Sequence, residues 1–238
     1  MKKYIKHIVP SLIVIGLLIV MYAIVGIIPF GNITATQGDN AVGGVSEALY
    51  WLKILQGKAS IFYDYCMGLG TNTYAYMFFV GKFTPFNLLE IFFNAQTING
   101  FWGLNLMLKS AAMALTSYIF FNKIFKQSKD FYKISFSVMY GLSGYTFMNF
   151  GNTHFLEIAI LFPLFILAMK KIFDENKCID YIILLTLMLV FNFYISWMIL
   201  FFVIFAGAIG IFFYAKKRKQ KKNNNESFLV YIIFIIII

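Results

Sequence analysis

Charged side chains are scarce in this sequence, and acidic ones are the scarcest. Of 238 residues, 13% are charged and only 10 are Asp or Glu, whereas 61% are hydrophobic. A soluble domain is about a quarter charged, so this composition excludes an ordinary soluble protein. Several windows exceed the ~20 apolar residues that cross a bilayer, and their continuous rather than alternating character excludes a transmembrane barrel. The sequence therefore predicts an all-α, polytopic membrane protein with a single transmembrane domain over residues 1–238.

Cysteine is almost absent as well. The two cysteines, Cys66 and Cys178, form no CxxC or zinc pattern. The topology derived below places them on opposite sides of the membrane, so we expect no disulfide between them. The segment GLGTN, residues 68–72, lacks the rest of a phosphate-binding loop, which argues against a nucleotide site. Nothing in the sequence reads as a clear set of metal ligands.

Basic residues outnumber acidic ones two to one, and their positions indicate membrane topology rather than nucleic-acid binding. Lys2, Lys3 and Lys6 precede the first apolar run, residues 8–30, which predicts a cytoplasmic N-terminus. That run is too long for the apolar part of a signal peptide, and no cleavage motif follows, so we expect an uncleaved first span. In the complete topology, 16 of the 20 basic residues fall in segments predicted to be cytoplasmic.

The same rule decides a second apolar segment, residues 73–93. Four lysines follow the apolar run 101–122, so the loop after it is predicted to be cytoplasmic. If both segments crossed the membrane, that loop would lie outside. We therefore predict span 2 at 101–122, and an interfacial or re-entrant helix pair at 73–93 within an outer loop of residues 31–100. Residues 45–57 have apolar positions at helical spacing and predict either an amphipathic helix on the membrane surface or an ordinary packed surface helix.

Four more spans complete the predicted bundle, so that spans 2–6 occupy residues 101–215. They are expected near residues 134–150, 155–169, 179–194 and 197–215. A basic cytoplasmic loop, 216–226, follows. The apolar residues 227–238 would rise only ~18 Å as a helix, against ~30 Å of hydrocarbon. We expect them to begin a seventh span of a longer protein.

Polar residues other than the loop lysines gather on the predicted outer side. The candidate site residues there are Asp39, Asp64, Asn72, Lys82, His154, Glu157 and Asn192. Glu157 falls just inside a predicted span, where an ionisable group is costly unless it is paired or lines a wet cavity. We expect its neighbours to be His154 and a group from the outer loop. Each candidate also has a structural interpretation, such as a turn cap at Asp64, and Lys109 is an exception because it lies within span 2.

Short motifs in a fixed order resemble the YfhO family of bacterial membrane proteins. They are GDN after the first span, MGLGTNTYAYMFF, TPFNLLEIFF, YGLSGYTF, NTHFLEIAILFPLFIL and NFYISWM. Two departures are visible. Glu157 stands where the family usually has Asp, which keeps the carboxylate, and residues 40–44, NAVGG, lack the Gln and aromatic residues expected after Asp39. Family members are several times longer, so the resemblance covers their front part.

The resemblance implies a glycosyltransferase-C-like fold in the bacterial plasma membrane. Such enzymes take a sugar from a polyprenyl-phosphate carrier on the outer leaflet, and the YfhO group is associated with sugar decoration of teichoic-acid-type envelope polymers. The implied partners are a lipid-linked sugar donor, an envelope polymer acceptor and the membrane, with no nucleic acid. Because some relatives of the fold use a metal, a divalent cation stays open as a cofactor.

A mechanism follows from the resemblance as a hypothesis. Asp39 is predicted to act as general base toward the acceptor hydroxyl. His154, Lys82 and Asn72 are candidates for stabilising charge on the leaving phosphate, and Glu157 is a candidate for orienting His154 or the acceptor. The alternatives are a transporter or lipid flippase, which would place ionisable groups at the bilayer midplane in broken, paired helices, and an inactive fragment that serves as a scaffold.

Overall fold

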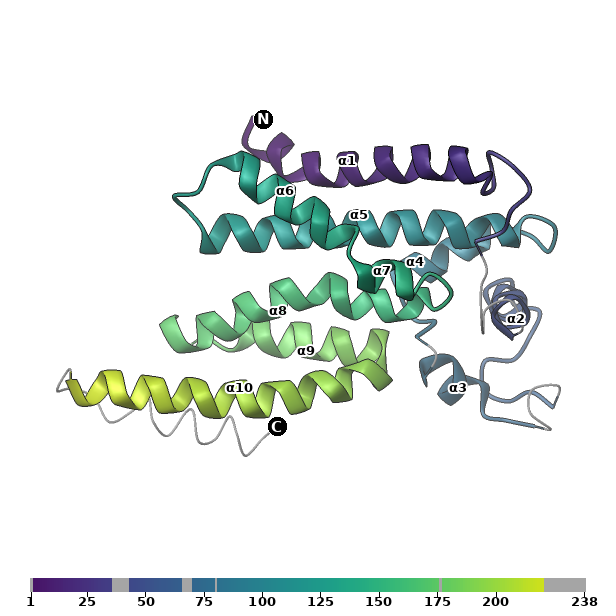
Figure 1. Cartoon of the computed structure of the whole chain (residues 1–238). Coiled ribbons are helices and arrows are strands. Elements are labelled where there is room, and N and C mark those ends of the chain that lie inside the picture. The colour runs from purple at the N-terminus through teal and green to yellow at the C-terminus, as the bar shows by residue number, and fades with distance from the viewer. Residues whose placement is uncertain (1, 36–42, 66–69, 80, 176, 221–238) are drawn as a thin grey trace.

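The computed structural model describes residues 2–35, 43–65, 70–79, 81–175 and 177–220, which are mainly helical (Figure 1). No strand occurs in these ranges, which confirms the predicted all-α class. The helices are, in chain order, α1 (Lys2–Val25), α2 (Val45–Leu55), α3 (Thr73–Phe79), α4 (Pro85–Leu88), η2 (Leu89–Phe92), α5 (Ile98–Ile124), α6 (Asp130–Gly141), α7 (Gly144–Met148), η3 (Thr153–Phe155), α8 (Leu156–Glu175), α9 (Ile179–Phe191) and α10 (Phe193–Gln220).

Helix α5 is the centre of the molecule. It packs against α1, α6 and α8, and its end nearest Ile98 also meets α2 and α4. Because α5 is apolar on most sides, it can be buried on most sides. One apolar cluster joins α1, α2 and α5 around Leu18 and Phe101, and a second joins α8, α9 and α10 around Phe165 and Met188. A third, around Leu106 of α5 and Leu156 of α8, connects the first group of helices to the second.

Two helices among the described residues are long and apolar enough to cross a membrane by length and composition. They are Lys6–Val25 of α1 and Ile98–Ile124, which is α5. Helix α9 and residues Phe193–Ile209 of α10 are also apolar but shorter, and α8 has 20 residues with charges at both ends. The six predicted spans therefore stay a prediction, and so does the orientation of the chain.

The ends of the long helices lie at two opposite ends of the bundle (Figure 1). The start of α1 lies beside the start of α6, where Lys6 Nζ is 2.6 Å from Asp130 Oδ2. The end of α8 lies beside the start of α9, where Lys171 pairs with Asp180. Figure 1 shows these loops at one end of the bundle and α2 and α3 at the opposite end. The N-terminal end of α1 and the loops after α5 and α8 thus share one end, and α2 and α3 lie at the other (Figure 1).

Three boundaries differ from the predicted ones. The segment predicted as span 3, residues 134–150, is split into α6 and α7, because Ser143 is extended between two glycines, which are poor helix formers. The turn between α9 and α10 is the single residue Asn192, whose Oδ1 accepts a hydrogen bond from the Ile195 N–H and so starts α10 at Phe193. Residues 73–93 contain three short helices rather than a pair.

Helix α2 bears on the two interpretations that the sequence left open. Its residues Ala48, Trp51 and Leu52 are buried, and the helix packs on α5 and η2. The apolar face of α2 is therefore covered by protein, as in a packed surface helix.

Candidate functional site

Two of the most deeply buried charges in the described part of the chain belong to Lys109 on α5 and Glu157 on α8. Lys109 Nζ lies 2.5 Å from Glu157 Oε1, and the side chains are 0% and 1% exposed. Lys109 also donates a hydrogen bond to the Thr153 carbonyl, at 3.1 Å. Removing either charge from water costs several kcal/mol, so each group is tolerated there because it neutralises the other.

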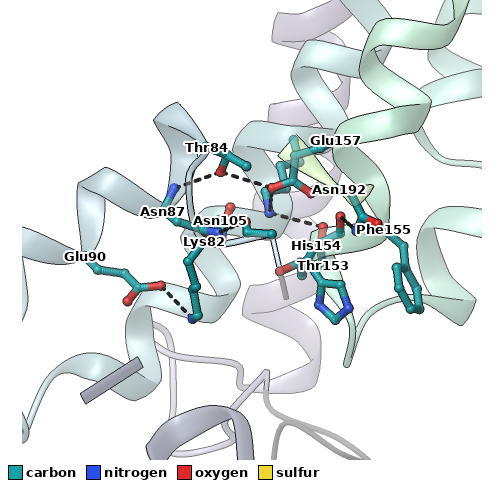
Figure 2. Close-up of polar contacts among 12 residues, drawn as sticks. Lys82, Thr84, Asn87, Glu90, Asn105, Thr153, His154, Phe155, Glu157 and Asn192 are labelled. Carbon is teal, nitrogen blue, oxygen red and sulfur yellow. Dashed lines mark hydrogen bonds and ion pairs between the residues drawn. The ribbon is translucent and has the colours of Figure 1, made fainter. Parts of the chain in front are cut away.

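Thr84 reaches Glu157 because of a local capping motif. Pro85 occupies the first position of α4, where its missing N–H is not needed, and Thr84 Oγ1 accepts a hydrogen bond from the Asn87 N–H at 3.3 Å. The same hydroxyl donates to Glu157 Oε1 at 3.2 Å (Figure 2). In contrast, Glu157 Oε2 is buried and has no hydrogen-bond partner among the described residues. Because buried polar atoms are usually paired, Oε2 is an exception among the atoms of this site.

A second buried pair joins Lys82, in the segment between α3 and α4, to Glu90 of η2. Lys82 Nζ lies 3.4 Å from Glu90 Oε1, and the side chains are 6% and 0% exposed (Figure 2). The ammonium also lies 5.6 Å from the centroid of the Trp102 ring, within the range of a cation–π contact. Glu90 therefore neutralises Lys82 in this structure, and the role of Lys82 toward a leaving phosphate stays a prediction.

Two asparagine side chains link α5 to the backbone just before Lys82. Asn105 Nδ2 donates to Asn87 Oδ1 at 3.1 Å, and Asn87 Nδ2 donates to the Gly81 carbonyl at 2.9 Å. Asn105 lies three residues after Trp102 and four before Lys109, so these three side chains share one face of α5. One helix face therefore holds groups that touch both ion pairs.

Gly81 allows the chain to turn into Lys82. Its φ is +70°, which favours glycine, and a Cβ there would lie 2.6 Å from the Phe191 carbonyl oxygen. We expect Gly81→Ala to lower the free energy of unfolding by about 2 kcal/mol, because backbone strain and a clash add. Denaturant unfolding in micelles measures this. The control is Gly16→Ala, where a Cβ meets nothing within 4 Å, and an equal loss in both variants would contradict the expectation.

The side chain of Asn192 contacts the backbone of His154. Asn192 Nδ2 donates to the His154 carbonyl at 2.9 Å (Figure 2). The hydrogen-bond partners of Glu157 in the described structure are Lys109 and Thr84, so the outer loop supplies one neighbour as expected, whereas the His154 ring does not supply the other. Burial, together with the charges of Lys109 and Lys82, lowers the pKa of His154 to about 4. At neutral pH this imidazole is a neutral hydrogen-bonding group and not a cation.

The remaining predicted site residues lie elsewhere. Asp39, the predicted general base, falls outside the described residues, as does Cys66. Asp64 is in the loop after α2, where its backbone pairs with that of Thr71. Asn72 is exposed, and its Oδ1 accepts the Ala75 N–H at the start of α3, at 3.0 Å. Asn72 is therefore a helix-capping residue in this structure.

Sequence reasoning missed the cationic partner of Glu157 and the acidic partner of Lys82. Lys109 and Glu90 were both visible as charges inside apolar segments, and such charges are usually paired, but the partner could not be chosen from the sequence.

Across the described ranges, no group of three or more His, Cys, Asp or Glu side chains could hold a metal ion. Both buried carboxylates are paired with lysines, an arrangement that does not fit a divalent cation.

Comparison with known proteins gives the chain a family. A family model described as "Bacterial membrane protein YfhO" matches residues 11–238. The comparisons with curated proteins and with solved structures find no match. The family match covers most of the first candidate membrane helix, all of the second, and every residue of the two buried ion pairs. This chain belongs to the YfhO family of bacterial membrane proteins.

Proposed function

We propose that this protein is a membrane glycosyltransferase. It would move a sugar from a polyprenyl-phosphate carrier to an envelope polymer of the teichoic-acid type, at the outer face of the bacterial plasma membrane. The observation that carries the proposal is Glu157, a buried carboxylate with Oε1 fixed by Lys109 and Thr84 and with Oε2 unpartnered among the described residues. A carboxylate held in this way can accept a hydrogen bond from a substrate hydroxyl and fix its direction.

The proposed step is a substitution at the anomeric carbon of the donor sugar. The oxygen of the acceptor hydroxyl attacks that carbon, and the bond from the carbon to the phosphate oxygen breaks with its electron pair going to the phosphate. Asp39 takes the hydroxyl proton as general base. Glu157 orients the acceptor through Oε2. His154, which is neutral at pH 7, supplies a hydrogen-bond donor rather than a charge toward the leaving phosphate.

Sided membrane vesicles test this function. Right-side-out vesicles that contain the chain are given a radiolabelled polyprenyl-phosphate sugar and an envelope polymer, and label in the polymer is measured. We expect transfer in these vesicles and about 100-fold less transfer with Asp39→Asn, which removes the base but keeps the shape of the side chain. The exposed Asp174, at the opposite end of the bundle, provides the matched control Asp174→Asn. Wild-type turnover in Asp39→Asn would remove Asp39 from the mechanism.

One observation also favours a lipid-linked sugar transporter. Buried, paired charges inside apolar helices occur in transport proteins, and Lys109 of α5 with Glu157 of α8 is such a pair. The same vesicles separate the two functions, because a transporter moves labelled lipid between leaflets without putting label into the polymer. Label that changes leaflet but stays on the lipid would replace the enzyme proposal with the transporter.

A further inference from the structure

The cluster around Lys82, beneath α2, contains more hydrogen-bonding atoms than the chain satisfies. Glu90 Oε2 and the indole Nε1 atoms of Trp102 and Trp51 are buried without a hydrogen-bond partner in the described ranges. Their residues are 0%, 5% and 2% exposed. Because most buried polar atoms in a folded protein are paired, three unpaired atoms in one place require an explanation.

These atoms come from three helices that meet the segment carrying Lys82. Lys82 pairs with Glu90 of η2 and lies over the ring of Trp102 on α5. The Trp51 ring of α2 packs edge-on against Phe83, the residue after Lys82, with 5.4 Å between centroids. Helix α2 packs on both η2 and α5, so the Glu90 carboxylate and the Trp102 indole border the Lys82 ammonium, and Trp51 reaches the same segment of the chain through Phe83.

The unpaired atoms define what a ligand must offer. Glu90 Oε2 accepts and so needs a donor, whereas the two indole N–H groups need acceptors. Lys82 has three ammonium hydrogens, and within the described ranges its hydrogen bond goes to Glu90. A hydroxyl group donates once and accepts twice, so a ligand with several hydroxyls fits this set.

Charge excludes the other common ligands. A phosphate accepts hydrogen bonds but is repelled by Glu90, and the carboxylate of Glu47 on α2 acts on the same place. A divalent cation is repelled by Lys82. A neutral ligand has neither cost, and aromatic side chains with a few placed polar groups are the usual lining of small-molecule sites.

We infer that Lys82, Glu90, Trp102 and Trp51 form a binding site for the hydroxyl groups of a sugar ring. Helix α2 covers the site, so the ligand enters when α2 shifts. The site is separate from Glu157 and stands without the proposed function. The assignment of its ligand as the donor's sugar does rest on that function.

Tryptophan fluorescence tests the inference, because the chain has only three tryptophans and two of them are in the site. In a Trp197→Phe background, which removes the half-exposed third tryptophan of α10, both remaining tryptophans report on it. The 238-residue chain in lipid nanodiscs is titrated with glucose, galactose and N-acetylglucosamine, and separately with inorganic phosphate. We expect a saturable fluorescence change with at least one sugar and none with phosphate. Glu90→Gln should weaken sugar binding at least tenfold.

Two further variants keep the test decisive. Glu175→Gln is the matched control, because Glu175 lies at the far end of α8, is half exposed and pairs with Lys177. If Glu90→Gln fails to fold in a thermal melt, Trp102→Phe keeps the ring over Lys82, removes one donor and leaves Trp51 as reporter, with the same expected loss. No response to any of the sugars would mean that buried water satisfies these atoms, and it would overturn the inference. Full sugar binding in the folded variants would also overturn it, and so would a response to phosphate alone. Failure of sugar transfer in vesicles leaves this binding result unchanged, so the two proposals fail separately.

Discussion

Lys109→Met is expected to lower the free energy of unfolding by about 3–5 kcal/mol, the usual cost of leaving one partner of a buried ion pair unpaired. Methionine keeps the length and apolar stem of the side chain, so packing between α5 and α8 is little changed. The ammonium that lies 2.5 Å from Glu157 is lost, and among the side chains that the structure describes the carboxylate keeps the Thr84 hydroxyl as its partner. Denaturant unfolding of the purified chain in micelles measures the difference.

The double variant Lys109→Met/Glu157→Gln shows whether charge is the cause. A buried pair replaced by neutral groups of similar volume is often close to neutral in stability, so we expect the double variant to recover most of the loss. Lys171→Met removes an exposed lysine that pairs with Asp180, and such surface pairs contribute little. If Lys109→Met is as stable as the wild type, or if the double variant is no more stable than the single one, the pair does not stabilise the fold through its charges.

Much of the architecture could be predicted because it depends on periodicity and on charge bias along the chain. The first apolar run ends close to the predicted position, with α1 stopping at Val25, and α5 contains the predicted span 101–122. The break at Ser143 was harder to predict, since the segment around it is apolar enough for a continuous span and only two glycines indicate the interruption.

The site was predicted less well, because its contacts join residues that are far apart in the sequence. Glu157 was chosen for being an acid at the start of a span, but its partner Lys109 lies 48 positions earlier, in another helix. The sequence marks Lys82 as a candidate contact for the leaving phosphate, and only the fold reveals that Glu90 neutralises it. Sequence patterns identify charges that need partners, whereas the pairing itself depends on how helices pack.

The same neutral double variant, Lys109→Met/Glu157→Gln, is expected to lose sugar transfer by a factor on the order of 1,000 while it remains folded. Removing one preorganised polar group from an active site costs about 100- to 1,000-fold in rate, and this variant removes both the carboxylate that would orient the acceptor and the ammonium that holds it. Initial rates of transfer in right-side-out vesicles, divided by the amount of folded protein, measure the effect. The control is Lys171→Met/Asp180→Asn, which neutralises a pair at the opposite end of the bundle and should transfer at the wild-type rate.

How the loss divides between kcat and KM decides the role of Glu157. If the carboxylate fixes the direction of attack, its contact is strongest in the transition state, and kcat falls while KM for the acceptor changes little. If it only binds the acceptor, KM rises and kcat is kept. We expect the first result, because Oε1 is already fixed by Lys109 and Thr84 and the carboxylate is held rigidly before any substrate arrives. A folded double variant that transfers at the wild-type rate would make the pair purely structural and would remove Glu157 from the proposed mechanism.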